Sequence, residues 1–364
     1  MSTAEERRAT AAALTLHTAR IAELATDLQY ARQPEVWERY GVRGRELSVR
    51  DMTYHLPFLG TAIVADEPRV FADYVAWIRH LFARLGFEDP AAAVLLACMR
   101  DAIAEALPGG LGAVAVPYIE AGVAELAAPL RRFASFLEDD GHPLRPLARL
   151  YLDALLKNDR AAARTLVLDA VARGVGLREV LLRVLQDVQR EVGRLWFSAE
   201  ISVAREHYCT AVTQDVIAHL YPRIMDTPRV GRRIVVACAA GESHDLGARM
   251  VADFFELAGW DAVFLGRDTP TAALAEAVRE HRPDVLGVSA NMSFHFPAVR
   301  DGIAAARRAD PTGRLRVLVG GYQFDATPGL WTRTGADGSA SDADAAVATA
   351  EALVAAVRGQ GVAS

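Results

Sequence analysis

The first 138 residues carry apolar side chains at the three-to-four-residue spacing of amphipathic helices. The clearest case is residues 68–87, where Pro68 stands at a helix start and Gly86 just past the helix end. After a loop at 107–112, the helical pattern resumes over 113–137. Because no strand pattern interrupts this region, residues 1–138 are predicted to form an all-α domain, globin-like or a helix bundle.

A second helical region follows the polar stretch 138–146, which breaks the pattern and marks a domain boundary. Four helical segments with short joints come next: residues 144–157, 160–172, 177–196 and 203–220. Ser202 stands in the N-cap position of the last segment. Short connections make consecutive helices antiparallel, so residues 139–222 are predicted to form a four-helix-bundle cap domain.

The hydrophobic period changes after the linker 221–233. Short β-branched apolar runs, typical of strands buried on both faces, lie at residues 234–239, 262–265, 285–288 and 315–319. Helical segments separate them at residues 246–258, 271–280 and 298–308. The alternation predicts an α/β doubly wound, Rossmann-like domain over 231–364 that binds its ligand beyond the carboxyl ends of the strands.

Charge and cysteine usage narrow the function classes. The formal net charge is −6, and no run of Lys or Arg favours nucleic acid or a membrane surface. Cys98, Cys209 and Cys238 lie far apart without a CxxC pair, as expected in a reducing compartment. The N-terminus is too polar for a signal peptide, and no apolar run is long enough to span a membrane. A cytoplasmic protein without membrane attachment is predicted.

Candidate chemistry lies in the loop after the first predicted strand, which contains Glu242, Ser243, His244, Asp245 and Gly247. The loop lacks the GxGxxG pattern of dinucleotide sites. The imidazole of His244 can ligate a metal, and the carboxylate of Glu242 can hold the other ring nitrogen. Taken alone, the loop is better explained by a histidine exposed in a surface turn.

Two spacings to residues further along the chain make the interpretation of that loop more specific. Forty-one residues separate Gly247 from Ser289, and twenty-eight separate Asn291 from the pair Gly320 and Gly321. This arrangement resembles the signature of base-off, His-on cobalamin-binding domains, which is Asp-x-His-x-x-Gly, then Ser-x-Leu, then Gly-Gly.

The resemblance implies that His244 ligates cobalt from below and that Ser289 hydrogen-bonds the benzimidazole. The glycine pair would let the backbone approach the nucleotide tail without a Cβ clash. Two residues depart from the signature: Glu242 replaces Asp, and Asn291 replaces Leu. The first keeps the chemistry of a carboxylate on a longer arm, and the second removes some apolar lining.

The cap carries a second motif, in which nine residues separate Trp196 from Glu206 and His207. This arrangement resembles the cap of light-sensing adenosylcobalamin repressors of the CarH type. The resemblance implies that Trp196 covers the adenosyl group, that Glu206 hydrogen-bonds it and that His207 lies nearby. Phe197 stands where those repressors have a histidine, so a bis-His light state built at that position is excluded. The alternative is a bundle-core tryptophan and a solvated Glu-His pair.

The N-terminal domain stands where those repressors have a MerR-type DNA reader, so direct DNA binding is not expected. It resembles the globin-like domain of photocobilins, which pair cobalamin with biliverdin. A bilin needs stacking aromatics and donors for its propionates, and the candidates are Tyr54, His55, Trp77, His80 and Arg84. Ordinary packing explains each of them equally well, and haem ligation by His55 or His80 is a further alternative.

Together these resemblances imply a light sensor that binds adenosylcobalamin, with biliverdin as a second chromophore. Photolysis would switch its conformation and the state of a homo-oligomer, and a downstream protein or enzyme would be the partner. No nucleophile–base pair stands out, so no enzymatic activity is expected. The alternatives are a corrinoid carrier subunit for methyl transfer or a mutase, and a module that senses cobalamin or haem by binding alone.

Overall fold

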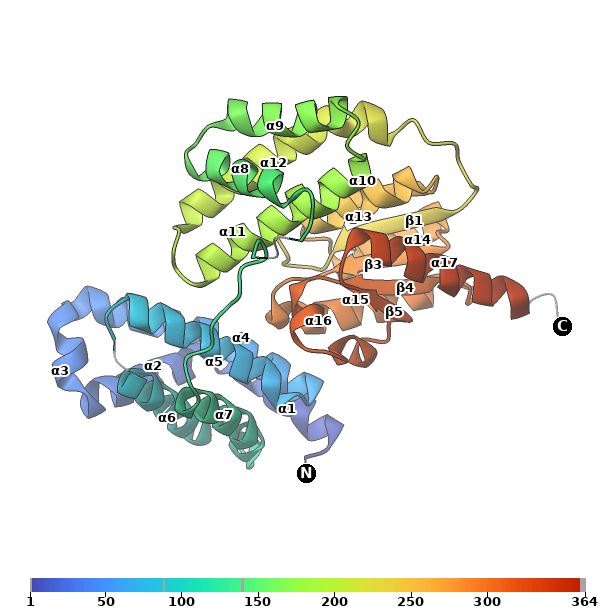
Figure 1. Cartoon of the computed structure of the whole chain (residues 1–364). Coiled ribbons are helices and arrows are strands. Elements are labelled where there is room, and N and C mark those ends of the chain that lie inside the picture. The colour runs from blue at the N-terminus through green and yellow to red at the C-terminus, as the bar shows by residue number, and fades with distance from the viewer. Residues whose placement is uncertain (1, 88, 139–140, 361–364) are drawn as a thin grey trace. The chain divides into compact units, whose positions relative to one another are not determined.

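The computed structural model describes residues 2–87, 89–138 and 141–360 (Figure 1). The chain divides into two compact units, Met1–Arg132 and Phe133–Ser364. The boundary stretch expected at 138–146 includes residues 139–140, which lie outside the described residues. Within the described ranges, no helix is both long enough and apolar enough to cross a membrane.

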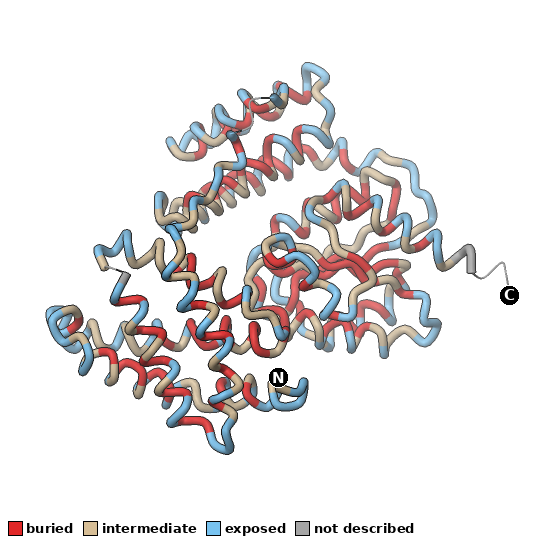
Figure 2. The backbone as a smooth tube through the Cα atoms, turned by 60° about the horizontal axis from the view of Figure 1, so that its bottom comes forward, coloured by how far each residue is buried: buried red, intermediate tan, exposed pale blue. Residues whose placement is uncertain are grey.

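The first unit is helical, as the pattern predicts. Its helices are α1 (Ala4–Leu16), α2 (Thr18–Arg32), α3 (Pro34–Trp37), η1 (Glu38–Tyr40), α4 (Gly41–Ala65), α5 (Pro68–Arg84), α6 (Asp89–Ala106) and α7 (Leu111–Ala127). Pairs α5–α7, α2–α6 and α1–α4 pack together. The long helices are buried along one side and exposed along the other (Figure 2), so this unit encloses a core of its own.

One helix of this unit ends earlier than predicted. The pattern over 113–137 predicts a continuous helix, but α7 ends at Ala127, and Ala128 is extended with ψ 160°. Pro129 is the reason, because the ring of a proline clashes with a helical conformation of the residue before it. The apolar residues that follow Ala128 therefore belong to a connecting segment, and the prediction of a helix there was wrong.

The second unit begins with the four-helix cap. It consists of α8 (Arg145–Leu156), α9 (Arg160–Ala172), a composite helix made of α10 (Leu177–Val180), the π-helical segment η2 (Leu181–Gln186) and α11 (Asp187–Phe197), and finally α12 (Val203–Ile224). Ser202 caps α12 as predicted, since its side chain accepts from the N–H of Arg205. The linker expected from residue 221 starts later, because α12 continues until Ile224 is buried beside Leu220.

A five-stranded parallel sheet with flanking helices completes the second unit. Its elements are β1 (Arg233–Cys238), α13 (Leu246–Leu257), β2 (Asp261–Gly266), α14 (Thr271–His281), β3 (Val285–Ser289), η3 (Ser293–His295), α15 (Phe296–Ala309), β4 (Arg316–Gly320), α16 (Tyr322–Ala326), η4 (Leu330–Arg333), β5 (Gly338–Ala340) and α17 (Ala343–Gln360). The strand order is β2-β1-β3-β4-β5. Helices α13 and α17 cover one face, and α14 and α15 cover the other (Figure 1).

The strand order locates the ligand site. The chain reverses direction across the sheet between β1 and β3, which pair in parallel from Ile234 with Val285 to Cys238 with Ser289. At such a switch point the loops after the two strands diverge and leave a crevice at their carboxyl ends. The loops that begin at Ala239 and Ala290 therefore border one crevice, and both contain residues of the predicted signature.

Candidate cofactor-binding site

A histidine–carboxylate pair forms the loop between β1 and α13. Nδ1 of His244 donates to Oε1 of Glu242 over 2.5 Å, and the backbone N–H of His244 donates to the same oxygen over 2.9 Å. The Glu242 side chain is fully buried, whereas that of His244 is 50% exposed. Because the carboxylate fixes the proton on Nδ1, the lone pair of Nε2 is available to a metal.

Hydrogen bonds and nearby charges shift the pKa values of Glu242 and His244 in opposite directions. Burial works against the charged form of Glu242, but hydrogen bonds from His244 and Asn291 hold its pKa at about 2. The hydrogen bond to Glu242 raises the pKa of His244, against the effect of burial, and the charges of Glu206 and Asp245 raise it further. A carboxylate that stays charged makes the imidazole a more basic ligand.

The same carboxylate ties the other signature loops to His244. Oε2 of Glu242 accepts from the backbone N–H groups of Asn291 (2.6 Å) and Met292 (3.2 Å). Oδ1 of Asn291 in turn accepts from the N–H of Tyr322, next to the glycine pair, over 2.9 Å. The departure from leucine at position 291 thus has a structural role, because the Asn291 side chain adds a hydrogen bond between the loops after β3 and β4 that leucine could not make.

The two glycines serve different needs: Gly321 adopts a left-handed backbone conformation, and Gly320 lies close to a neighbouring strand. Gly321 has φ +112°, and a Cβ added there would lie 2.2 Å from the carbonyl oxygen of Ala290. At Gly320 an added Cβ would lie 3.2 Å from the carbonyl oxygen of Ala340. Gly247 opens α13 with free space around its Cα. The loops after β3 and β4 therefore approach each other closely, whereas approach to a nucleotide tail stays a prediction.

The remaining predicted residues of this site lie around the same crevice. Ser289 ends β3 and is half-buried, whereas Ser243 is exposed in the His244 loop. Asp245 precedes α13, and its Oδ1 accepts a long hydrogen bond (3.4 Å) from Nε2 of Gln214 on α12. That contact joins the cap to the His244 loop.

Sequence reasoning missed two residues that support the loop. The buried His295 lies in η3, with Nε2 3.9 Å from Oε2 of Glu242, and its ring packs against Gly241. Asp268, after β2, accepts from the N–H of Gly241 over 2.6 Å. Neither residue belongs to the signature, and only the order of the strands brings them to this loop.

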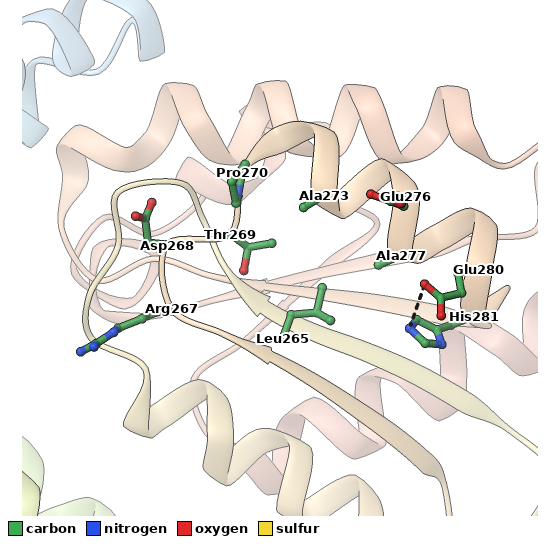
Figure 3. Close-up of a pocket in the computed structure, with 10 residues that line it drawn as sticks. All are labelled: Leu265, Arg267, Asp268, Thr269, Pro270, Ala273, Glu276, Ala277, Glu280 and His281. Carbon is green, nitrogen blue, oxygen red and sulfur yellow. Dashed lines mark ion pairs between the residues drawn. The ribbon is translucent and has the colours of Figure 1, made fainter.

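A shallow hollow of about 330 Å³ lies beside β2 and α14 (Figure 3). Its lining comprises Leu265, Arg267, Asp268, Thr269, Pro270, Ala273, Glu276, Ala277, Glu280 and His281. None of these residues belongs to the signature, and His281 pairs with Glu280. The hollow therefore flanks the crevice without containing the residues that carry the chemistry.

One face of α12 extends from the cap motif to the His244 loop. Glu206, Thr210 and Gln214, here called the α12 stripe, are spaced four residues apart and share a face of α12. Gln214 contacts Asp245, and the charge of Glu206 acts on His244. His207 is 73% exposed, with Nε2 3.5 Å from Oε2 of Glu206, and Trp196 is half-buried near the end of α11.

The five candidate bilin residues lie on α4 and α5 of the first unit. His55 is buried, and its Nδ1 lies 2.6 Å from the hydroxyl of Tyr74, whose ring is stacked on Phe58 at 3.7 Å and lies 5.6 Å from Trp77. Burial lowers the pKa of His55 to about 4, so this imidazole is neutral. His80 donates to the carbonyl of Arg131 over 2.7 Å, and Tyr54 and Arg84 are exposed.

Comparisons with known proteins agree with this geometry. Residues 232–348 match the family described as B12 binding domain, and residues 147–221 match a second family of the same description. Dimethylamine corrinoid protein 3 of Methanosarcina mazei is 32% identical over 122 residues, which are 34% of this chain and 72% of that protein. The chain belongs to the cobalamin (B12)-binding family. Residues 1–126 match the family described as phycobilisome protein.

Two other relatives extend the comparison. The HTH-type transcriptional repressor CarH of Myxococcus xanthus is 31% identical over 182 residues, 49% of this chain. Those residues span 59% of the repressor, less than two thirds of its length. The monomethylamine corrinoid protein of Methanosarcina barkeri shares the fold, with a TM-score of 0.52 and 22% identity over 57% of this chain and 99% of that one.

The residues of this cobalamin-binding protein fit a corrinoid. His244 offers a single imidazole nitrogen from below, held by a charged carboxylate. The strand order places this loop at the switch point between β1 and β3, where parallel sheets bind ligands. An imidazole nitrogen held available to a metal suits the cobalt of a corrinoid.

Proposed function

We propose that this protein is a light sensor that binds adenosylcobalamin base-off, with His244 as the lower ligand of cobalt. The observation that carries the proposal is the α12 stripe, which extends from the Trp196–Glu206–His207 motif to the His244 loop. The motif above the corrin and the ligand below it therefore border one site. Similarity to the repressor CarH supports the same conclusion.

When bound, adenosylcobalamin supplies a cobalt–carbon bond that light can break. Trp196 would cover the adenosyl group, and Glu206 would accept a hydrogen bond from it. These contacts would stabilise one arrangement of cap and sheet in the dark. Without the adenosyl group both side chains would lose these contacts, so the balance between two arrangements would shift and an interface between copies of the chain would change with it.

Biliverdin in the first unit would extend the response to red light. The cluster of Phe58, Tyr74 and Trp77 supplies aromatic faces, and the neutral His55 supplies a polar contact. The match to the phycobilisome-protein family supports a light-related role for this unit, because a phycobilisome is a light-harvesting assembly. This role makes the protein a cytoplasmic regulator of a downstream partner, without catalysis of its own.

The test is spectroscopic. Purified protein loaded with adenosylcobalamin and biliverdin is followed by absorbance and size-exclusion chromatography before and after green light. The proposal expects a base-off cobalamin spectrum in the dark, a spectral change on illumination and a shift in elution volume. A holoprotein whose spectrum and elution volume both stay constant under light contradicts it.

A second function is favoured by the similarity to a dimethylamine corrinoid protein. In that case the chain is a corrinoid carrier, and His244 holds a cobalamin that exchanges a methyl group with a partner enzyme. Methylcobalamin would then bind at least as tightly as adenosylcobalamin, and illumination would leave the oligomeric state unchanged. The same two measurements, repeated with methylcobalamin, separate the two functions.

A further inference from the structure

A chain of polar side chains crosses the core of the cap and ends at Glu206. Tyr151 on α8 lies with its hydroxyl 2.9 Å from Oγ1 of Thr213 on α12, and both residues are fully buried. Oγ1 of Thr213 lies 2.7 Å from the side-chain amide of Gln189 on α11. The other end of that amide lies 3.1 Å from Oγ1 of Thr210, which lies 2.8 Å from Oε1 of Glu206.

The number of available protons decides which group donates in each hydrogen bond of this row of polar side chains. The Thr210 hydroxyl has one proton, so it donates either to Glu206 or to Gln189 but not to both. The structure has the Gln189 amide nitrogen on Thr213 and the amide oxygen on Thr210; with the amide turned over, each contact between these side chains pairs a donor with an acceptor. Tyr151 then donates to Thr213, Thr213 to Gln189, Gln189 to Thr210 and Thr210 to the carboxylate. The turned amide then has its oxygen facing the Cys209 carbonyl oxygen, in place of a long hydrogen bond (3.4 Å) that the nitrogen donates there.

Buried hydroxyl and amide groups are costly in a helix bundle unless they are satisfied, and apolar residues of similar shape would fill the same space. The fully buried Tyr151 and Thr213 therefore need a reason other than packing, whereas Gln189 and Thr210 are half-buried. The carboxylate at the end of the network supplies that reason, because the Thr210 hydroxyl on Oε1 fixes the rotation of the carboxylate, whose Oε2 lies 3.5 Å from Nε2 of His207.

We propose that Gln189 and Thr210 are positioning residues that orient Glu206 toward the adenosyl group and so select adenosylcobalamin over cobalamins with a small upper ligand. This inference rests on the proposed function, since it needs an adenosyl group beneath the cap. It adds a source of ligand specificity that lies inside the bundle, outside both sequence motifs.

The test compares binding of adenosylcobalamin and hydroxocobalamin to the full-length protein in the dark. Thr210→Val keeps the shape of the side chain and removes the hydroxyl. We expect it to weaken adenosylcobalamin about tenfold and to change hydroxocobalamin affinity less than about twofold. Gln189→Leu is expected to act in the same direction, and Thr210→Ser to restore the wild-type preference. Thr165→Val, on the exposed face of α9, is the matched control.

A double-mutant cycle separates positioning from packing. In a Glu206→Ala background, Thr210→Val is expected to have no further effect on adenosylcobalamin. If Thr210→Val weakens both cobalamins equally, or adds fully to Glu206→Ala, the residue acts through packing and the inference is wrong. If the wild-type protein itself shows no preference for adenosylcobalamin, the proposed function fails and the inference fails with it.

Discussion

The single side chain of Glu242 accepts hydrogen bonds from three other residues. Its two oxygens accept from the ring and backbone of His244 and from two amides of the loop after β3. A buried carboxylate is tolerated because these donors replace its hydration. The ligand histidine is therefore oriented by the same group that holds the loops of the crevice together.

Substitutions at positions 242 and 244 should separate ligation from structure. His244→Ala is expected to abolish the base-off spectrum and to lower the melting temperature modestly, because its side chain is half exposed but the buried carboxylate of Glu242 loses one of its four donors. Glu242→Ala is expected to weaken cobalamin about 10- to 100-fold and also to cost about 1–3 kcal/mol of stability, because it leaves buried N–H groups without an acceptor. Absorbance titration and thermal melting without cobalamin measure the two effects.

Glu242→Gln is the control for this pair of substitutions. It keeps an acceptor for the loop amides but removes the charge, so stability should fall less than in Glu242→Ala while cobalamin affinity still falls. A His244→Ala variant that keeps the base-off spectrum would show that another group ligates cobalt.

At the scale of elements, the sequence predicted the strands that are buried on both faces and missed a strand whose environment comes from its neighbours. Strands β1, β3 and β4 are runs of β-branched and apolar residues buried on both faces, and the sequence locates them within a residue or two. The short β5 (Gly338–Ala340) has no such run, because neighbouring strands and α17 supply its environment. The helix ends at Ala127 and Ile224 depend on one proline and on one buried contact, which a periodic pattern does not resolve.

The residues of the site also divide into those that the sequence predicted and those that it did not. The signature predicted Glu242, His244 and the glycine pair, because their spacing follows from the strand and helix lengths of the fold. The polar chain through Gln189 and Thr213 was not predicted, since single polar residues at helical core positions have no pattern of their own. The one available signal was Thr213, a polar residue on the buried face of α12 between Val212 and Val216.

Helix α13 carries a carboxylate whose burial should make stability depend on pH. Desolvation raises the pKa of Asp253 to about 6, although Tyr221 donates to its Oδ1 over 3.1 Å. The folded state therefore keeps a proton that the unfolded chain loses near pH 4, and stability falls as pH rises through about 4 to 6. Asp253→Asn removes this cost and still accepts from Tyr221.

The gain from Asp253→Asn is expected to be small at pH 4 and to reach about 2–3 kcal/mol at pH 7.5, since each pKa unit corresponds to about 1.4 kcal/mol. Urea denaturation at the two pH values measures it. Asp215→Asn, at an exposed position of the neighbouring α12, is the control and should change stability little at either pH. An equal gain from Asp253→Asn at both pH values would contradict the assignment.

At the scale of the whole molecule, cobalamin binding belongs to one unit. Every contact that builds the crevice, from the α12 stripe to the glycine pair, lies within Phe133–Ser364. The first unit has its own buried core, with Ile21, Leu59 and Phe71 fully enclosed. Two units with separate cores are expected to fold and to bind their ligands separately.

This separation predicts the behaviour of the two halves of the chain. A fragment of residues 133–364 should bind adenosylcobalamin within about threefold of the affinity of the full-length protein, since it retains every residue of the site. A fragment of residues 1–132 should remain helical and bind biliverdin without cobalamin. Absorbance titration of each fragment with each chromophore, beside the full-length protein, makes the comparison. A loss of more than about tenfold in cobalamin affinity for residues 133–364, with its circular dichroism still native, would mean that the first unit contributes to the cobalamin site.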